Sequence, residues 1–117
     1  MKDLEFVGSS REDLSAFPQE VKSVMGFALR QAQAGEKHPH AKPLKGFSGA
    51  GVLEVVEDFD GDTFRAVYTV RFSARVYVLH AFQKKSKTGI AAPKQHLDLI
   101  HRRLKRAQDH YQQRPNF

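Results

Sequence analysis

The segment Val76–Lys85 places residues of distinct chemistry at short, regular spacing. His80 and Phe82 lie two residues apart, and Lys84 and Lys85 follow directly. Alternate residues of a β-strand point to the same side, so a strand here would present the imidazole, the phenyl ring and the Lys84 ammonium together. A histidine titrates near neutral pH and can move protons, and lysines attract phosphate. The segment therefore indicates a site for a phosphate-bearing ligand.

A preceding strand, expected over residues 62–72, brings Arg65 to the same place. If Ser73 and Ala74 form a two-residue hairpin loop, Phe72 pairs with Arg75 and Arg65 pairs with Phe82, and opposed residues share a face. The face expected to form the core under the helices holds Ala66, Tyr68, Val70, Phe72, Tyr77, Leu79 and Ala81. The face expected to stay open holds Arg65, Val67, Thr69, Arg71, Val76, Val78, His80, Phe82 and Lys84.

These residue types suit RNA cleavage without a metal or another cofactor. RNA carries its own nucleophile, the 2′-hydroxyl, so a protein must supply proton transfer and cations that stabilise the phosphorane charge. We therefore expect Arg65, His80 and Lys84 to be catalytic, with Arg65 holding a phosphate bidentately. The residues expected to bind RNA are Lys45, Arg71, Phe82, Lys85, Lys87, Arg102 and Arg106.

The charge distribution agrees with a polyanionic partner. Residues 65–117 hold twelve of the nineteen lysines and arginines but only two of the thirteen acidic residues, so this half of the chain is strongly basic. A field of one sign over one part of a domain is typical of nucleic-acid-binding proteins. The 117 residues predict a single domain, and the absence of cysteine excludes disulfides and thiolate metal sites. No apolar segment is typical of a signal peptide or a membrane span, so we expect a cytoplasmic protein without a membrane partner.

Each of these residues also has a structural interpretation. A single strand histidine is more often structural than catalytic, and Phe82 could simply pack against the sheet. The lysines could protect a strand edge from pairing, and the arginines near residue 102 could form a solvated helix face. Glu54 could be a base or a partner in an ion pair. The functional interpretation rests on the convergence of these residues on one hairpin.

The surrounding pattern predicts an α+β fold. A short strand near residues 4–7 precedes a helix with a capping box, Ser9 to Glu12, and a second helix runs from Pro18 to Gly35. Residues 38–50 read as a loop. Strands are expected over residues 51–58, 62–72 and 75–85, and a helix over 93–111. We expect all helices on one face of an antiparallel sheet, and a flexible tail over residues 112–117.

In order along the chain, four segments resemble the RelE/HigB-like toxins of type II toxin–antitoxin systems. They are Lys42–Phe47, Gly51–Val55, Arg65–Tyr68 and Val76–Ser86, and a Gly89–Pro93 segment follows as in the phage-derived HigB-like subfamily. The resemblance runs from Leu4 to about Tyr111. The family's sheet arginine corresponds to Arg65, its strand aromatic to Tyr68, and its last-strand motif to Leu79, His80, Phe82, Lys84 and Lys85.

This resemblance implies a microbial-RNase-type fold and a ribosome-dependent mRNA endonuclease, an mRNA interferase that inhibits translation. It also implies a cognate HigA-like helix-turn-helix antitoxin. Two alternatives stay open, a ParE-like gyrase inhibitor of the same fold and a non-catalytic nucleic-acid-binding module. Where many members carry an arginine two residues after the strand glutamate, this chain has Val56, and Tyr111 is the one candidate for a C-terminal catalytic tyrosine.

Overall fold

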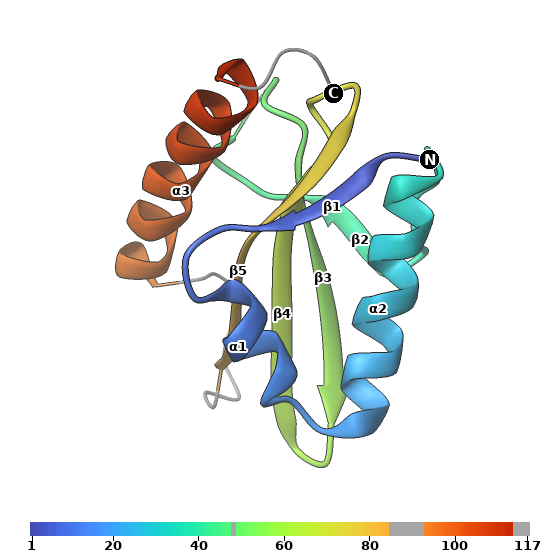
Figure 1. Ribbon diagram of the computed structural model, residues 1–117. Coiled ribbons are helices and arrows are strands. Elements are labelled where there is room, and N and C mark those ends of the chain that lie inside the picture. Colours follow the sequence, from blue (N-terminus) through green and yellow to red (C-terminus); the bar gives the residue numbers. More distant parts are fainter. Residues whose placement is uncertain (48, 85–92, 114–117) are drawn as a thin grey trace.

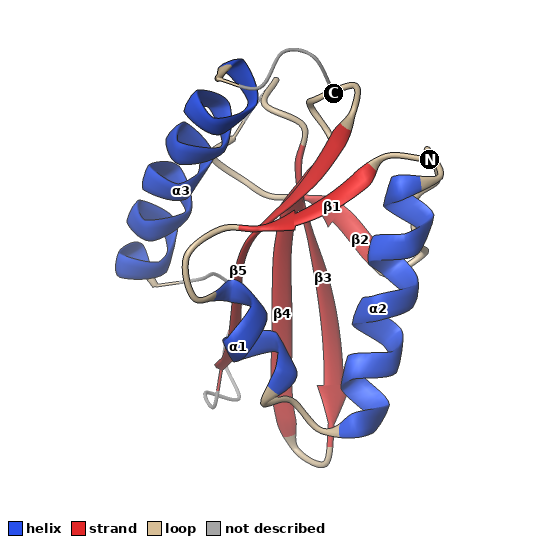
Figure 2. Cartoon of the chain, viewed as in Figure 1, coloured by secondary structure: helices blue, strands red, loops and turns tan. Residues whose placement is uncertain are grey.

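The computed structural model describes residues 1–47, 49–84 and 93–113, which form an α+β fold as the sequence predicts (Figures 1 and 2). Three helices and five strands alternate irregularly along this part of the chain. In order they are β1 (Asp3–Phe6), α1 (Ser10–Ser15), α2 (Gln19–Gln33), β2 (Ala41–Pro43), β3 (Val52–Phe59), β4 (Asp62–Thr69), β5 (Arg75–Lys84) and α3 (Lys94–Gln112). The predicted residues Lys85 and Lys87 and most of the predicted tail lie outside the described residues.

The five strands form one mixed sheet in the order β1-β5-β4-β3-β2. The meander β3-β4-β5 is antiparallel, as predicted, and Asp60-Gly61 forms its first turn with positive φ at both residues. β1 pairs with β5 in parallel, so the sheet is not wholly antiparallel. β2 lies in the segment predicted as loop. Its three residues include Pro43, which an edge strand tolerates because no further strand needs its missing N–H.

The helices cover both faces of the sheet, so the prediction that all of them lie on one face is wrong. One face, here called the α2 face, packs Ala66, Tyr68, Val76, Val78 and Ala81 against the buried stripe of α2. The opposite face, here called the α3 face, packs Val67, Tyr77, Leu79 and Phe82 against Ile100, Leu104 and Ala107 of α3. Figure 1 shows α2 and α3 on opposite flanks of the strands.

A β-bulge at Leu79 changes which residues of β5 face each side. The predicted pairing holds from Thr63↔Lys84 to Val67↔His80, but beyond it Tyr68 pairs with Val78 instead of Leu79. A bulge places two residues of one strand opposite one residue of its partner. Leu79 and Tyr77 therefore lie on the α3 face, whereas the sequence-based register placed them with Tyr68. Val76 and Val78 move to the α2 face for the same reason.

The N-terminus of α1 differs from the predicted capping box. Ser9 is the N-cap residue, but its hydroxyl makes no bond to a helix N–H. It donates instead to the Asp13 carboxylate at 2.8 Å and accepts from Arg103 of α3 at 3.1 Å. The end of α2 follows the prediction, because Gly35 takes a φ of +83° directly after the C-cap residue Ala34. Ser9 thus links α1 to α3 rather than capping α1.

Candidate functional site

His80 lies on the α3 face, directly after the bulge. Its Cα partner Val67 belongs to the core of that face, and opposed residues of two strands share a face. The His80 residue is only 5% exposed, so the open strand position expected from the sequence is closed by the chain itself. Helix α3 is the element that covers it.

A second histidine, His96, contacts His80 from α3. His80 Nε2 lies 2.8 Å from Nδ1 of His96, which is in the first turn of α3. His96 is half-buried, whereas His80 is buried. His96 could not be identified as a site residue from the sequence. It lies sixteen residues after His80, on a different element, and this spacing does not predict a contact between them. The signal that could have found it is the placement of a histidine at the start of the helix that follows the strand.

The environment of His80 keeps its imidazole neutral at physiological pH. Burial, and after it the neighbouring His96 and Arg103, lower the pKa of His80 from 6.5 to about 4, while Asp13 acts in the opposite direction. Burial dominates because removing water penalises the charged imidazolium. A neutral imidazole can accept one hydrogen bond and donate another. His80 is therefore suited to orient His96 or to exchange a proton with it.

Phe82 is part of a three-ring stack with the two histidines. Its ring centroid lies 4.1 Å from that of His96 at an interplanar angle of 13°, and 4.9 Å from that of His80 at 21°. Phe82 is 7% exposed, so it does not present the open ring that the sequence predicted for stacking on a base. The ring instead fixes the plane of both imidazoles.

Arg65 and Glu54 form a buried ion pair beside the histidines. Arg65 Nη1 donates to Glu54 Oε1 at 2.8 Å, and the two side chains are 6% and 8% exposed. Glu54 and His80 flank Val67 from the two neighbouring strands, and Arg65 lies opposite Phe82. The prediction that Arg65 sits on an open face is therefore wrong, because α3 covers part of this face and Glu54 holds the guanidinium. Of the two roles left open for Glu54, the structure shows an ion pair.

The other predicted binding residues are spread over the surface. Lys45 is exposed in the loop after β2, and Arg71 is exposed with its guanidinium 5.9 Å from the ring of Phe72. Arg102 and Arg106 are exposed on α3. Lys84 is the last residue of β5, and its side chain is outside the described part of the chain. None of these surface residues is brought into the histidine pair.

Two further residues differ from their expected roles. Arg103 is not part of a solvated helix face: it is 8% exposed and donates to the Leu79 carbonyl oxygen at 2.9 Å. Tyr111 is held at the other end of α3, where its hydroxyl lies 3.0 Å from the Ser73 hydroxyl and accepts from the Ala74 N–H at 3.2 Å. Tyr111 is therefore placed as a structural contact to the β4–β5 connection.

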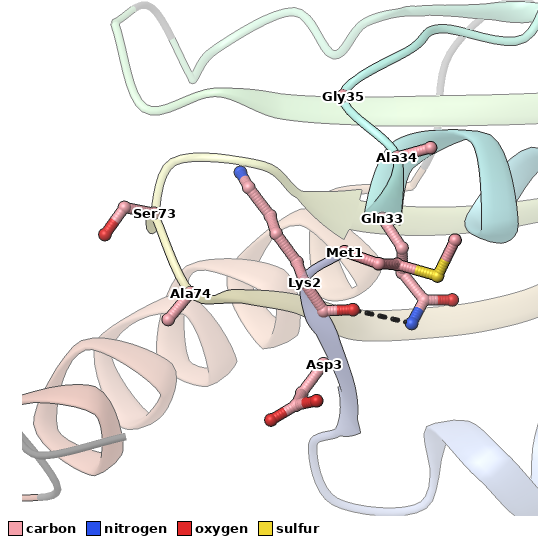
Figure 3. Close-up of a pocket in the computed structure, with 8 residues that line it drawn as sticks. All are labelled: Met1, Lys2, Asp3, Gln33, Ala34, Gly35, Ser73 and Ala74. Carbon is pink, nitrogen blue, oxygen red and sulfur yellow. Dashed lines mark hydrogen bonds between the residues drawn. The ribbon is translucent and has the colours of Figure 1, made fainter.

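A separate hollow of about 650 Å³ lies where the N-terminal residues meet the end of α2 and the β4–β5 connection (Figure 3). Lys2 spans it and donates to the Val70 carbonyl oxygen at 3.1 Å, and the Gln33 amide donates to the Lys2 carbonyl oxygen at 2.8 Å. Its described lining contains no histidine. The His80–His96 pair is therefore not part of this hollow.

Within residues 1–47, 49–84 and 93–113, no three histidine, aspartate or glutamate side chains come together in a way that could hold a metal ion. No helix in the described part of the chain has the length and apolar character needed to cross a membrane.

Comparison with known proteins gives one family and a distant structural likeness. The family model described as "Phage derived protein Gp49-like (DUF891)" matches residues 12–105. A chain from the crystal structure of the toxin–antitoxin complex RelBE2 of Mycobacterium tuberculosis is similar at 21% identity, with a TM-score of 0.46, over 73% of this chain and 93% of that chain. No curated protein matches.

Proposed function

The chain belongs to the phage-derived Gp49-like family, and we propose that it is the toxin of a type II toxin–antitoxin system. In this proposal it is an endoribonuclease that cuts translated mRNA on the ribosome and so inhibits translation. A cognate antitoxin, of the HigA-like helix-turn-helix class, neutralises it. The phage-derived description of the family supports the phage-derived part of the resemblance.

The observation that carries the proposal is the His80–His96 pair. RNA cleavage through the 2′-hydroxyl needs a group that takes a proton and a group that returns one, and histidine serves both roles near neutral pH. Two imidazoles whose ring nitrogens lie 2.8 Å apart, beside a buried arginine on the same sheet face, supply a proton-transfer group and a neighbour that orients it from protein side chains alone. A module that only bound phosphate would need no paired imidazoles.

The positive charge supports RNA as the ligand. The formal net charge is +6, and exposed arginines of α3, Arg102 and Arg106, lie on the helix that carries His96. Phosphate contacts of this kind supply most of the sequence-independent affinity for nucleic acid. In the proposal Lys45, Arg71, Lys85 and Lys87 add to this attraction, and Lys84 joins Arg65 and the histidine pair in stabilising the phosphorane.

The test is primer extension on a message that is being translated. Expression of the wild-type chain is expected to produce cuts within the reading frame, whereas the same message without its start codon should stay intact. Replacing His80 and His96 together with leucine should abolish the cuts. Growth arrest without mRNA cleavage, together with loss of gyrase supercoiling activity, would favour a ParE-like function instead.

The partner is tested by co-expression. If a small helix-turn-helix reading frame adjoins the gene, its product should co-purify with the chain and restore growth. A chain that never slows growth and binds no such product would contradict the toxin assignment.

A further inference from the structure

The two histidines of the pair differ in their access to solvent. His80 of β5 is 5% exposed beneath α3, and His96 is half-buried at the start of α3. Their contact joins His80 Nε2 to His96 Nδ1 at 2.8 Å. His96 is therefore the more solvent-accessible of the two histidines.

The surroundings of His80 disfavour a positive charge on its imidazole. The groups that face His80 are His96 and Arg103 from α3 and Asp13 from α1, and burial together with His96 and Arg103 outweighs the one carboxylate. An imidazolium carries hydrogen on both nitrogens. When His96 is charged, its Nδ1–H must donate to His80 Nε2, and this bond becomes charge-assisted and stronger.

The stack of Phe82 with the two imidazoles fixes the orientation of His80 relative to His96. Phe82 lies almost parallel to the His96 ring at 13° and 4.1 Å, and the His80 ring lies 4.9 Å from Phe82. Rotation of either imidazole about its χ2 angle would break this stacking as well as the nitrogen–nitrogen contact. Nε2 of His80 is thus held against Nδ1 of His96.

From this geometry we propose that His96 is the residue that exchanges the proton with RNA, and that His80 is a positioning residue that holds His96 and receives its Nδ1–H. The proposal rests on the proposed endoribonuclease function. Nε2 of His96 takes the 2′-hydroxyl proton while the 2′-oxygen forms its bond to phosphorus. The bond from phosphorus to the 5′-oxygen then breaks, its electron pair stays on that oxygen, and water protonates it. The hydroxide so formed takes the proton back from His96, which leaves a 2′,3′-cyclic phosphate and a 5′-hydroxyl.

Four variants separate the two roles. His96→Asn keeps an amide near the position of Nδ1 but removes Nε2, so cleavage should slow by about 10²-fold or more. His80→Gln places an amide oxygen near Nε2 and should keep the rate within about 10-fold of wild type, since a neutral acceptor remains. His80→Leu removes the acceptor and should approach His96→Asn. His101→Asn, an exposed histidine of the same helix, is the matched control and should cut like wild type.

Two results with these variants would overturn the proposal. Wild-type rates in His96→Asn would overturn it, and so would a His80→Gln variant as inactive as His80→Leu, because His80 would then be the group that transfers the proton. Circular dichroism and urea unfolding of each variant separate lost chemistry from lost folding.

A measurement without RNA tests the pair itself. In ¹⁵N-labelled protein, long-range ¹H–¹⁵N spectra between pH 4 and pH 8 report which imidazole nitrogens carry hydrogen. On lowering the pH, His96 should become charged first, with hydrogen on Nδ1, while His80 stays neutral. A pair in which His80 charges first would overturn the relay while leaving the endoribonuclease function standing. Absence of RNA cleavage by the wild type would overturn that function, and with it the RNA step, whatever the spectra show.

Discussion

Arg103 on α3 donates a hydrogen bond of 2.9 Å to the carbonyl oxygen of Leu79, the bulged residue of β5. A bulge interrupts the ladder and leaves a backbone group to be satisfied from outside it, and Arg103 does so while also contacting Ser9 at 3.1 Å. One side chain therefore ties α3, β5 and the start of α1 together. The bulge directly precedes His80, so this contact also fixes the backbone next to the histidine pair.

The first prediction is that Arg103→Met destabilises the fold. Losing charged hydrogen bonds to Leu79 and Ser9 should lower the free energy of unfolding by about 2 kcal/mol. The adjacent Arg102 is exposed and offers a matched control, since Arg102→Met should change it by less than about 0.5 kcal/mol. Urea unfolding measures both, and equal losses in the two variants would contradict this role for Arg103.

The second prediction concerns the buried pair of Glu54 and Arg65. Glu54→Gln removes the carboxylate to which the guanidinium donates at 2.8 Å, and breaking a buried pair in this way costs about 3–5 kcal/mol. Replacing both residues, as Glu54→Leu with Arg65→Met, should restore much of that loss. A double-mutant cycle in urea gives the coupling between them. A coupling near zero would show that the pair does not act as a unit.

The third prediction uses two buried tyrosines on opposite faces of the sheet. The Tyr68 hydroxyl is buried without a hydrogen-bond partner among the described residues, and burial raises the pKa of Tyr68 to about 12. Tyr68→Phe should therefore raise the free energy of unfolding by about 1 kcal/mol. Tyr77→Phe should lower it by about as much, because the Tyr77 hydroxyl lies 2.7 Å from Nδ1 of His110. Shifts of the same sign in both variants would contradict this account.

The regular parts of this fold could be predicted from local pattern. The apolar spacing in α2 and α3, the Asp60-Gly61 turn and the α+β class follow from residue type and period. The pairing of Arg65 with Phe82 and of Val67 with His80 also agrees with the structure. These features depend on residues close together in the sequence.

The site itself could be predicted only in part. The helical stripe of α3 shows which side of the helix is buried, but not which face of the sheet receives it, so the burial of Arg65 and His80 was missed. The bulge at Leu79 has no residue signature, since any apolar residue can occupy it. His96 was missed because its contact with His80 depends on the path of α3. Each of these errors concerns a tertiary contact between separate segments.

The fourth prediction tests the exposed arginines of α3. Arg102→Gln with Arg106→Gln should weaken RNA binding and flatten its dependence on salt, because each lost phosphate contact reduces the slope of log K against log salt by about 0.7 for a single strand. Arg30→Gln with Lys37→Gln removes the same charge from exposed positions at α2 and just after it. If both double variants change the slope equally, net charge rather than an α3 contact governs binding.

The last prediction is a pH dependence of stability centred on His80. The pKa of His80 is lowered from 6.5 to about 4 in the folded protein. Between these values the unfolded chain binds more protons than the folded chain, so stability rises with pH across the window. The contribution is therefore complete above pH 6.5 and is lost as the pH falls toward 4. Its full size is about 3 kcal/mol, from about 1.4 kcal/mol for each unit of pKa.

Urea unfolding at intervals from pH 7.5 down to pH 4 measures this dependence. The wild type and His101→Asn should show the same pH dependence of stability, because His101 is exposed on α3, although loss of its stacking on Phe47 can shift the whole curve. His80→Gln should show a shallower curve, since it has no buried imidazole to be protonated on unfolding. Parallel curves for the wild type and His80→Gln would mean that His80 exchanges protons as readily in the folded protein as in the unfolded chain, against the burial described above.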